Sequence, residues 1–131
     1  TTALPPALVG AACTSICYLK NSDKERKLQQ KNTITLKNYL TKENINFMDN
    51  KSHIVPIMVN NPIRCKEISN ILLNEFNHYI QPINYPTVPV GTERLRVTPG
   101  PSHTEKMISD LTIALKYAFN ITEKNTYSKI A

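Results

Sequence analysis

A proline-punctuated stretch from residue 83 to residue 103, INYPTVPVGTERLRVTPGPSH, constrains the chain more than any other segment. Its prolines fix the backbone on both sides of a short predicted strand, residues 94–97. Because strand side chains repeat every second residue, Arg94 and Arg96 share one face of an ideal strand. Thr87 stands in the first proline-rich turn. A rigid backbone that presents a hydroxyl and planar guanidinium groups is suited to binding carboxylates.

Length and composition indicate one globular domain. The chain has 131 residues, of which 40% are hydrophobic, and no apolar run approaches the length of a membrane span. The net charge of +6 raises the possibility of an anionic partner, such as nucleic acid or coenzyme A. Lysines and arginines nevertheless stand beside acids, as in DKERK at 23–27, and no basic stripe is interleaved with aromatic residues. The sequence therefore favours a solvated charged surface, without nucleic-acid or membrane binding.

The three cysteines predict no disulfide framework and a reducing compartment. Cys13 and Cys17 are four residues apart and would share a helix face. That spacing is compatible with a metal, but no histidine or third cysteine is near in the sequence, so we interpret them as small buried residues. The first residues carry no basic leader and are interrupted by Pro5 and Pro6, and the chain starts without methionine. We expect no signal peptide, and a fragment or processed product.

Hydrophobic periodicity predicts an α+β domain in the order helix, helix, strand, helix, strand, strand, helix. Capping boxes are expected at Ser22 with Glu25 and at Ser102 with Glu105, and Asn61 is the expected N-cap before Pro62. Asn32 interrupts the apolar seam of the second helix. The predicted helices cover residues 7–19, 22–43, 61–76 and 102–121, and the predicted strands 53–59, 79–83 and 94–97.

The histidines and glycines give no catalytic pattern. The three histidines are far apart, and three glycines are too few for a phosphate-binding loop of the GxGxxG or Walker type. We expect His53 to be a satisfied core residue in its strand, His78 to be exposed, and His103 to cap or pack at the start of the last helix.

The motifs NYPTVP at 84–89 and TPGPSH at 98–103 resemble the α-oxoamine synthases, a family of fold-type I pyridoxal-phosphate (PLP) enzymes. The resemblance covers almost the whole chain, although Gly100 stands where the family usually has serine or threonine. It implies a C-terminal small domain with a three-stranded, mainly antiparallel sheet covered on one face by helices. Residues 1–20 would be the tail end of the PLP-binding large domain with the interdomain helix, and 21–131 the C-terminal α/β domain.

The resemblance implies an acyltransferase that uses PLP to condense glycine with succinyl-CoA, as a homodimer, in the branch of the family that serves haem synthesis. The cofactor would act as an electron sink. A sister branch that uses another amino acid or acyl chain is an alternative, and so is a free-standing C-terminal domain with a binding or regulatory role. The resemblance places the enzyme in the cytoplasm of a bacterium or the mitochondrial matrix of a eukaryote.

Individual roles follow from the same resemblance. Arg96 looks like the arginine that holds the carboxylate of glycine, and Thr87 like the hydroxyl that contacts the succinyl carboxylate. Thr1 and Thr2 look like the pair that reaches the cofactor phosphate across the dimer interface. The simpler alternatives are a surface ion pair for Arg96, a turn hydroxyl for Thr87 and helix capping for Thr1 and Thr2. The lysine that anchors the cofactor lies upstream in the family, so we expect no catalytic residue here and an inactive isolated chain.

Overall fold

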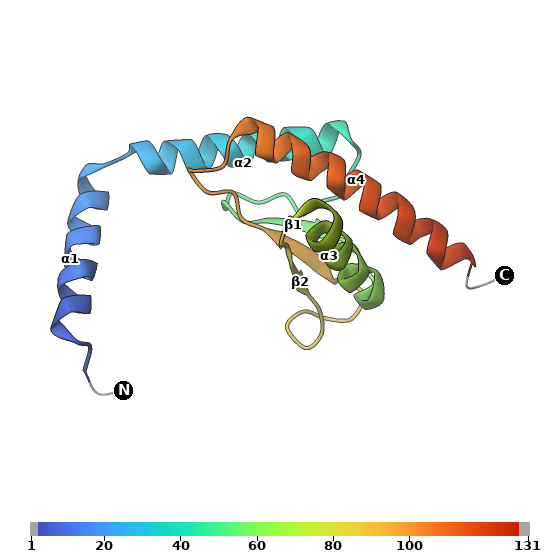
Figure 1. Cartoon of the computed structure of the whole chain (residues 1–131), viewed down its shortest axis with the longest axis horizontal. Coiled ribbons are helices and arrows are strands. Elements are labelled where there is room, and N and C mark those ends of the chain that lie inside the picture. Colours follow the sequence, from blue (N-terminus) through green and yellow to red (C-terminus); the bar gives the residue numbers. More distant parts are fainter. Residues whose placement is uncertain (1–2, 129–131) are drawn as a thin grey trace.

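The computed structural model describes residues 3–128, with side chains through residue 123. Over this part of the chain the predicted α+β order is confirmed (Figure 1). The elements are α1 (Pro6–Asn21), α2 (Lys24–Lys42), β1 (Val55–Met58), α3 (Pro62–Phe76), β2 (Gln81–Ile83), β3 (Arg94–Val97) and α4 (Glu105–Ser128). None of the helices in the described part is long and apolar enough to cross a membrane.

The last strand in sequence lies in the middle of the sheet. The strand order is β1-β3-β2, and both pairs are antiparallel. Arg96 of β3 is therefore flanked by Pro56 on one side and Gln81 on the other. Proline lacks an amide donor and fits edge strands, which agrees with Pro56 in β1 and Pro82 in β2.

Helices α2, α3 and α4 form the layer that covers one face of this sheet, as the resemblance implied, whereas α1 stands apart (Figure 1). Helix α3 contacts β2 and β3, and α4 lies against both α2 and α3 (Figure 1). Burying a large apolar side chain stabilises a fold by about 2 kcal/mol, so these side chains hold the layers together. The fully buried hydrophobic residues are Leu40, Val55, Ile57, Cys65, Ile68, Leu72, Leu95, Ala114, Leu115 and Ala118.

Of the three predicted helix caps, one is confirmed, one forms only in part and one is wrong. The side chain of Asn61 accepts hydrogen bonds from the amides of Ile63 and Arg64, both at 3.0 Å, so this N-cap is confirmed. At α4, however, Thr104 is the capping residue: its Oγ1 accepts from the amide of Met107 at 3.3 Å.

The Ser102 capping box is therefore wrong, because residues up to 103 belong to a turn held from another helix. At α2 the Ser22 hydroxyl donates to the Glu25 carboxylate, and no side chain caps the helix amides, so that box forms only in part.

Four further expectations differ from the structure, three of them in burial and one in the end of a helix. His53 is exposed and precedes β1, because pairing with β3 begins only at Val55. His78 is half-buried, since its amide donates to the carbonyl oxygen of Leu72 at 2.8 Å and so holds it against the end of α3. Helix α4 continues to Ser128, beyond its predicted end at residue 121. Cys13 and Cys17 are exposed, because α1 buries none of its residues in the described part of the chain.

Candidate functional site

Strand β3 presents Arg96 to a hollow of about 420 Å³ beside the sheet. Burial alternates along the strand, with Leu95 and Val97 in the core and Arg96 exposed. The walls come from the segment before β2, the turn after β3 and the first turns of α4. Its lining residues are Leu36, Asn77, His78, Tyr79, Ile80, Gln81, Arg96, Val97, Thr98, Pro99, His103, Met107, Ile108 and Leu111.

The charge in this hollow is unbalanced. Among its lining residues there is no aspartate or glutamate, and within the described residues Arg96 forms no ion pair. Its other polar lining residues are Asn77, His78, Tyr79, Gln81, Thr98 and His103. A planar guanidinium without a carboxylate partner suits a ligand that brings its own carboxylate.

Arg94 is held differently, although an ideal strand puts it on the same face. Its Nε donates a hydrogen bond to the carbonyl oxygen of Thr92 at 2.9 Å, and its side chain is half-buried. It does not line the hollow. The structure therefore distinguishes the two arginines, which the sequence alone does not.

Thr87 lies in the loop between β2 and β3, which projects from one end of the sheet (Figure 1). The loop contains a cis peptide bond between Tyr85 and Pro86, and the amide of Thr87 donates to the carbonyl of Asn84 at 3.0 Å. Thr87 is exposed and does not line the Arg96 hollow. The structure thus does not bring these two predicted ligands into one cavity. Thr1 and Thr2, the predicted phosphate ligands, lie outside the described residues.

Glu93 is a buried acid that the sequence analysis missed. Glu93 is fully buried, and both of its carboxylate oxygens accept a hydrogen bond from the amide of Gly91 at 3.1 Å. Gly91 has a φ of 83°, a left-handed conformation that favours glycine. Glu93 therefore closes the turn that leads from the Thr87 loop into β3. The sequence Gly-Thr-Glu directly before the strand could have indicated a turn that the glutamate closes.

Asn32 is the second residue whose role the sequence analysis missed. The sequence indicates it only as an interruption of the apolar seam of α2. It is buried and donates from Nδ2 to the carbonyl oxygens of Gly100 at 2.9 Å and His103 at 2.7 Å. His103, which was expected to cap or to pack, lies in this turn and lines the hollow: its Nδ1 accepts from the amide of Gly100 at 2.8 Å. No local pattern links residues 32 and 100, so sequence reasoning had no route to this contact.

Other reactive groups point away from catalysis. Burial raises the pKa of the Cys65 thiol to about 11, which keeps it protonated and unreactive. No cluster of histidine, cysteine or acidic side chains in the described residues is able to hold a metal ion. A second, more open hollow of about 530 Å³ has a basic lining that includes Arg26, Lys37 and Lys51. Lys37 is already paired there with Asp49 at 2.9 Å.

The lining of the Arg96 hollow supplies no anchor for PLP. No lysine lines the Arg96 hollow, so the described residues offer no amine for the cofactor aldehyde at that place. The unpartnered guanidinium fits the carboxylate of an amino acid held by such a cofactor. The hollow thus offers a cation for an acidic ligand and, among its lining residues, no amine to anchor PLP.

Comparison with known proteins shows the family of the chain. The family model described as aminotransferase class I and II matches residues 1–115. The 5-aminolevulinate synthase of Rickettsia bellii is 51% identical over 119 residues, which cover 91% of this chain and 29% of that protein. The mitochondrial 5-aminolevulinate synthase of Debaryomyces hansenii is 44% identical, over 92% of this chain and 21% of its own length. The chain thus spans less than a third of these curated relatives.

Solved structures show the same fold. A serine palmitoyltransferase from S. paucimobilis with a bound PLP–myriocin aldimine superposes with a TM-score of 0.84 at 25% identity, over 92% of this chain and 31% of that chain. The 8-amino-7-oxononanoate synthase of Francisella tularensis superposes with a TM-score of 0.78 at 21% identity, over 93% of this chain and 35% of that chain.

Proposed function

The chain belongs to the aminotransferase class I and II family, and from that premise we propose that it forms the C-terminal part of a 5-aminolevulinate synthase. The proposed reaction joins glycine and succinyl-CoA to give 5-aminolevulinate, coenzyme A and carbon dioxide. Identity of about half over nine-tenths of the chain supports this branch of the family. Residues 1–20 would then belong to the large domain and the interdomain helix, and residues 21–131 to the C-terminal domain.

The observation that carries the proposal is the unpaired Arg96 guanidinium in a hollow without acids. A guanidinium makes two parallel charge-assisted hydrogen bonds to a carboxylate. Two such bonds would fix the orientation of bound glycine, and with it the direction of the Cα–H bond that must break. Arg96 thus binds and orients the substrate and takes no proton itself.

PLP, when bound, supplies the electron sink that makes the α-proton of glycine acidic. In this proposal Thr1 and Thr2 contact its phosphate across a dimer interface, and a lysine upstream of residue 1 anchors it. The isolated 131-residue chain would therefore show neither activity nor a stable cofactor absorbance band.

Thr87 is the proposed contact for the far carboxylate of the succinyl group. Thr87 is exposed and lies outside the Arg96 hollow, so it would bind the far carboxylate of the succinyl group at a place distinct from the one that holds the carboxylate of glycine. In a full-length enzyme that contains this chain, Thr87→Val would raise the KM for succinyl-CoA about tenfold, because a charged hydrogen bond is lost. Thr87→Ser, which keeps the hydroxyl, would stay near the wild-type value. An unchanged KM for succinyl-CoA in Thr87→Val would argue against this role.

The alternative is a sister synthase, because an 8-amino-7-oxononanoate synthase shares the fold. A 2-amino-3-ketobutyrate CoA ligase would be another such sister enzyme. A further alternative, outside the enzymes, is a non-catalytic, free-standing C-terminal domain. Product formation by the full-length enzyme separates them: 5-aminolevulinate from glycine and succinyl-CoA supports our proposal. Turnover restricted to another amino acid or acyl-CoA would assign the chain to a sister branch.

A further inference from the structure

One buried amide joins two segments that are far apart in the sequence. Asn32 lies in α2, and its Nδ2 donates to the carbonyl oxygens of Gly100 and His103, at 2.9 and 2.7 Å. These carbonyls belong to the turn between β3 and α4. A single primary amide carries two N–H donors on one nitrogen, and both are used here.

The turn itself is closed by its own atoms. The amide of Gly100 donates to Nδ1 of His103 at 2.8 Å, and the amide of His103 donates to the carbonyl of Gly100 at 3.3 Å. Across the described residues, Asn32 supplies the hydrogen bonds from a side chain of another element to this turn. The turn is therefore a small unit attached to α2 through one residue.

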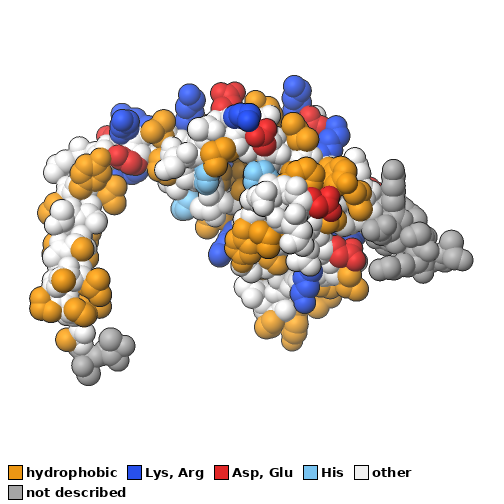
Figure 2. Space-filling model, in the orientation of Figure 1, with side chains coloured by type: hydrophobic (Ala, Val, Ile, Leu, Met, Phe, Trp, Pro, Cys, Tyr) orange, Lys and Arg blue, Asp and Glu red, His pale blue; other side chains and the backbone are white. Residues whose placement is uncertain are grey.

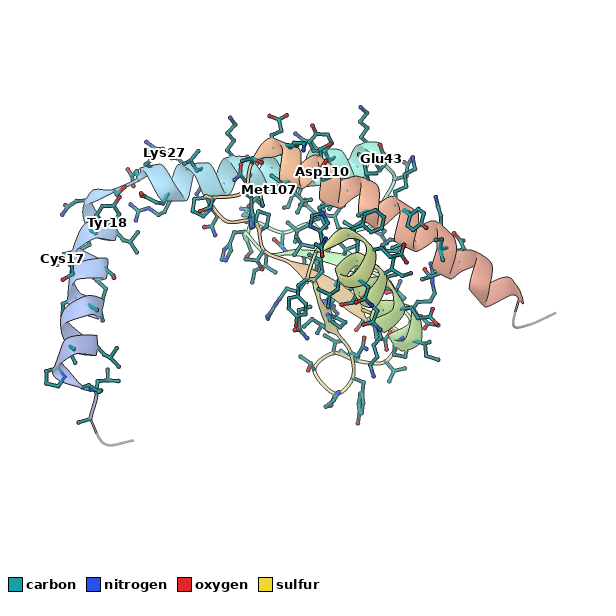
Figure 3. All side chains as sticks on the ribbon, in the orientation of Figure 1. Cys17, Tyr18, Lys27, Glu43, Met107 and Asp110 are labelled. Atoms are coloured by element: carbon teal, nitrogen blue, oxygen red, sulfur yellow. The ribbon has the colours of Figure 1, made fainter. Side chains whose placement is uncertain are left out.

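This unit forms a wall of the Arg96 hollow. Thr98, Pro99 and His103 all line the hollow, and so does Met107 in the first turn of α4, which is labelled in Figure 3. Arg96 lies only four residues before Gly100 along the chain. The place of the turn relative to α2 thus sets the width of the space that faces the guanidinium.

We infer that Asn32 is a positioning residue for the substrate carboxylate at Arg96. It acts through the turn and touches no substrate, and the inference rests on the proposed function of Arg96. An aspartate of nearly the same shape has no N–H donors when ionised, and it would place negative charge against two carbonyl oxygens. Release of the turn would leave the hollow wider and the carboxylate less well oriented, which weakens glycine binding.

The adjacent residue provides a matched control. Thr33 is also buried in α2, but its hydroxyl donates only to Gln29 of the same helix, at 2.8 Å. Thr33→Val removes a buried polar group from α2 and leaves the turn untouched. A general loss of helix stability would affect both positions, whereas the positioning role belongs to Asn32 alone.

The experiment compares Asn32→Asp, Asn32→Ala and Thr33→Val in the full-length, PLP-loaded enzyme. We expect each Asn32 variant to raise the KM for glycine about tenfold, with the KM for succinyl-CoA and kcat within about twofold. Hydrogen exchange at the amides of Gly100 and His103 should accelerate about tenfold in the Asn32 variants. Thr33→Val should change none of these quantities.

Each other outcome has a distinct meaning. A KM for glycine that stays at the wild-type value in both folded Asn32 variants would overturn the positioning role, even if the turn exchanges faster. Loss of folding in both variants, seen by thermal unfolding, would also overturn it and leave Asn32 as a stability residue. A wild-type enzyme that makes no 5-aminolevulinate would instead overturn the proposed function, and the inference with it.

Discussion

At the scale of single residues, identical side chains have different surroundings. Arg94 and Arg96 are two positions apart in β3. Arg94 donates a hydrogen bond to the carbonyl oxygen of Thr92, whereas Arg96 faces an open hollow that no acidic residue lines. The free guanidinium is the one able to accept a new carboxylate partner, because it has no bond in the described structure to give up. Surroundings therefore assign the role that residue type leaves open.

The cysteines allow a direct test at this scale. In the 131-residue chain, a thiol reagent at pH 8 should label Cys13 and Cys17 readily and leave Cys65 unlabelled until the protein is denatured. Burial raises the pKa of Cys65 to about 11, so about one thiol in a thousand is ionised at pH 8. Mass spectrometry of the labelled peptides gives the measurement. Labelling of Cys65 in the folded chain, at the rate of the other two, would contradict the buried α3 face.

The same pKa has a consequence for stability. An unfolded Cys65 titrates near its ordinary value of 9.0, below the folded value of about 11. The unfolded chain therefore releases this proton first, and the folded state loses stability as the pH rises from 9 to 11. Below pH 9 this contribution is fully present.

At the scale of elements, local signals predicted what local chemistry controls. Asn61 followed by Pro62 identified the start of α3, because cap and first turn lie within four residues. The predicted strand 53–59 starts two residues before β1 and ends one residue after it. The ends of β1 depend on where β3 stops pairing, which the local sequence does not show. The start of α4 was misplaced for the same reason: Asn32, about 70 positions away, holds the preceding turn. Periodicity carries no information on such partners.

The N-cap of α3 predicts a measurable stability difference. Asn61→Ala removes an acceptor for two helix amides, and we expect the free energy of unfolding to fall by about 1 kcal/mol. Asn70→Ala, at an exposed position in the middle of the same helix, should instead raise it by about 0.5 kcal/mol, because alanine is the better helix former. Urea unfolding of the two variants provides the comparison. Equal changes would show that the cap contributes nothing beyond helix propensity.

At the scale of the whole molecule, α1 stands apart from the packed layers. Its residues are all exposed, including Leu8, Ile16 and Leu19, and hydrophobic side chains run along its surface (Figure 2). Its contacts with α2 are local: Tyr18 donates to Glu25 at 2.9 Å and Arg26 to the carbonyl of Leu19 at 2.7 Å. Cys17 and Tyr18 lie far from the sheet in Figure 3. This arrangement agrees with the predicted boundary at residue 20, which stays a prediction.

Removal of α1 tests that boundary. A chain that begins at Ser22 should have the same free energy of unfolding in urea as the 131-residue chain, within about 0.5 kcal/mol. The reason is that α1 contributes no buried residue to the core. Hydrogen exchange in the longer chain should likewise be fast in α1 and slow in α3. A clear loss of stability on removal would mean that α1 packs on the domain in solution.

The most direct test of the whole account is glycine binding by two arginine variants of the full-length enzyme. Arg96→Lys keeps the charge but loses the paired hydrogen bonds, so we expect the KM for glycine to rise at least tenfold. Arg94→Lys, the same change two residues away, should stay within about threefold of wild type. That contrast would support Arg96 as the carboxylate ligand in its hollow. Equal effects, or a larger effect at Arg94, would contradict the central claim.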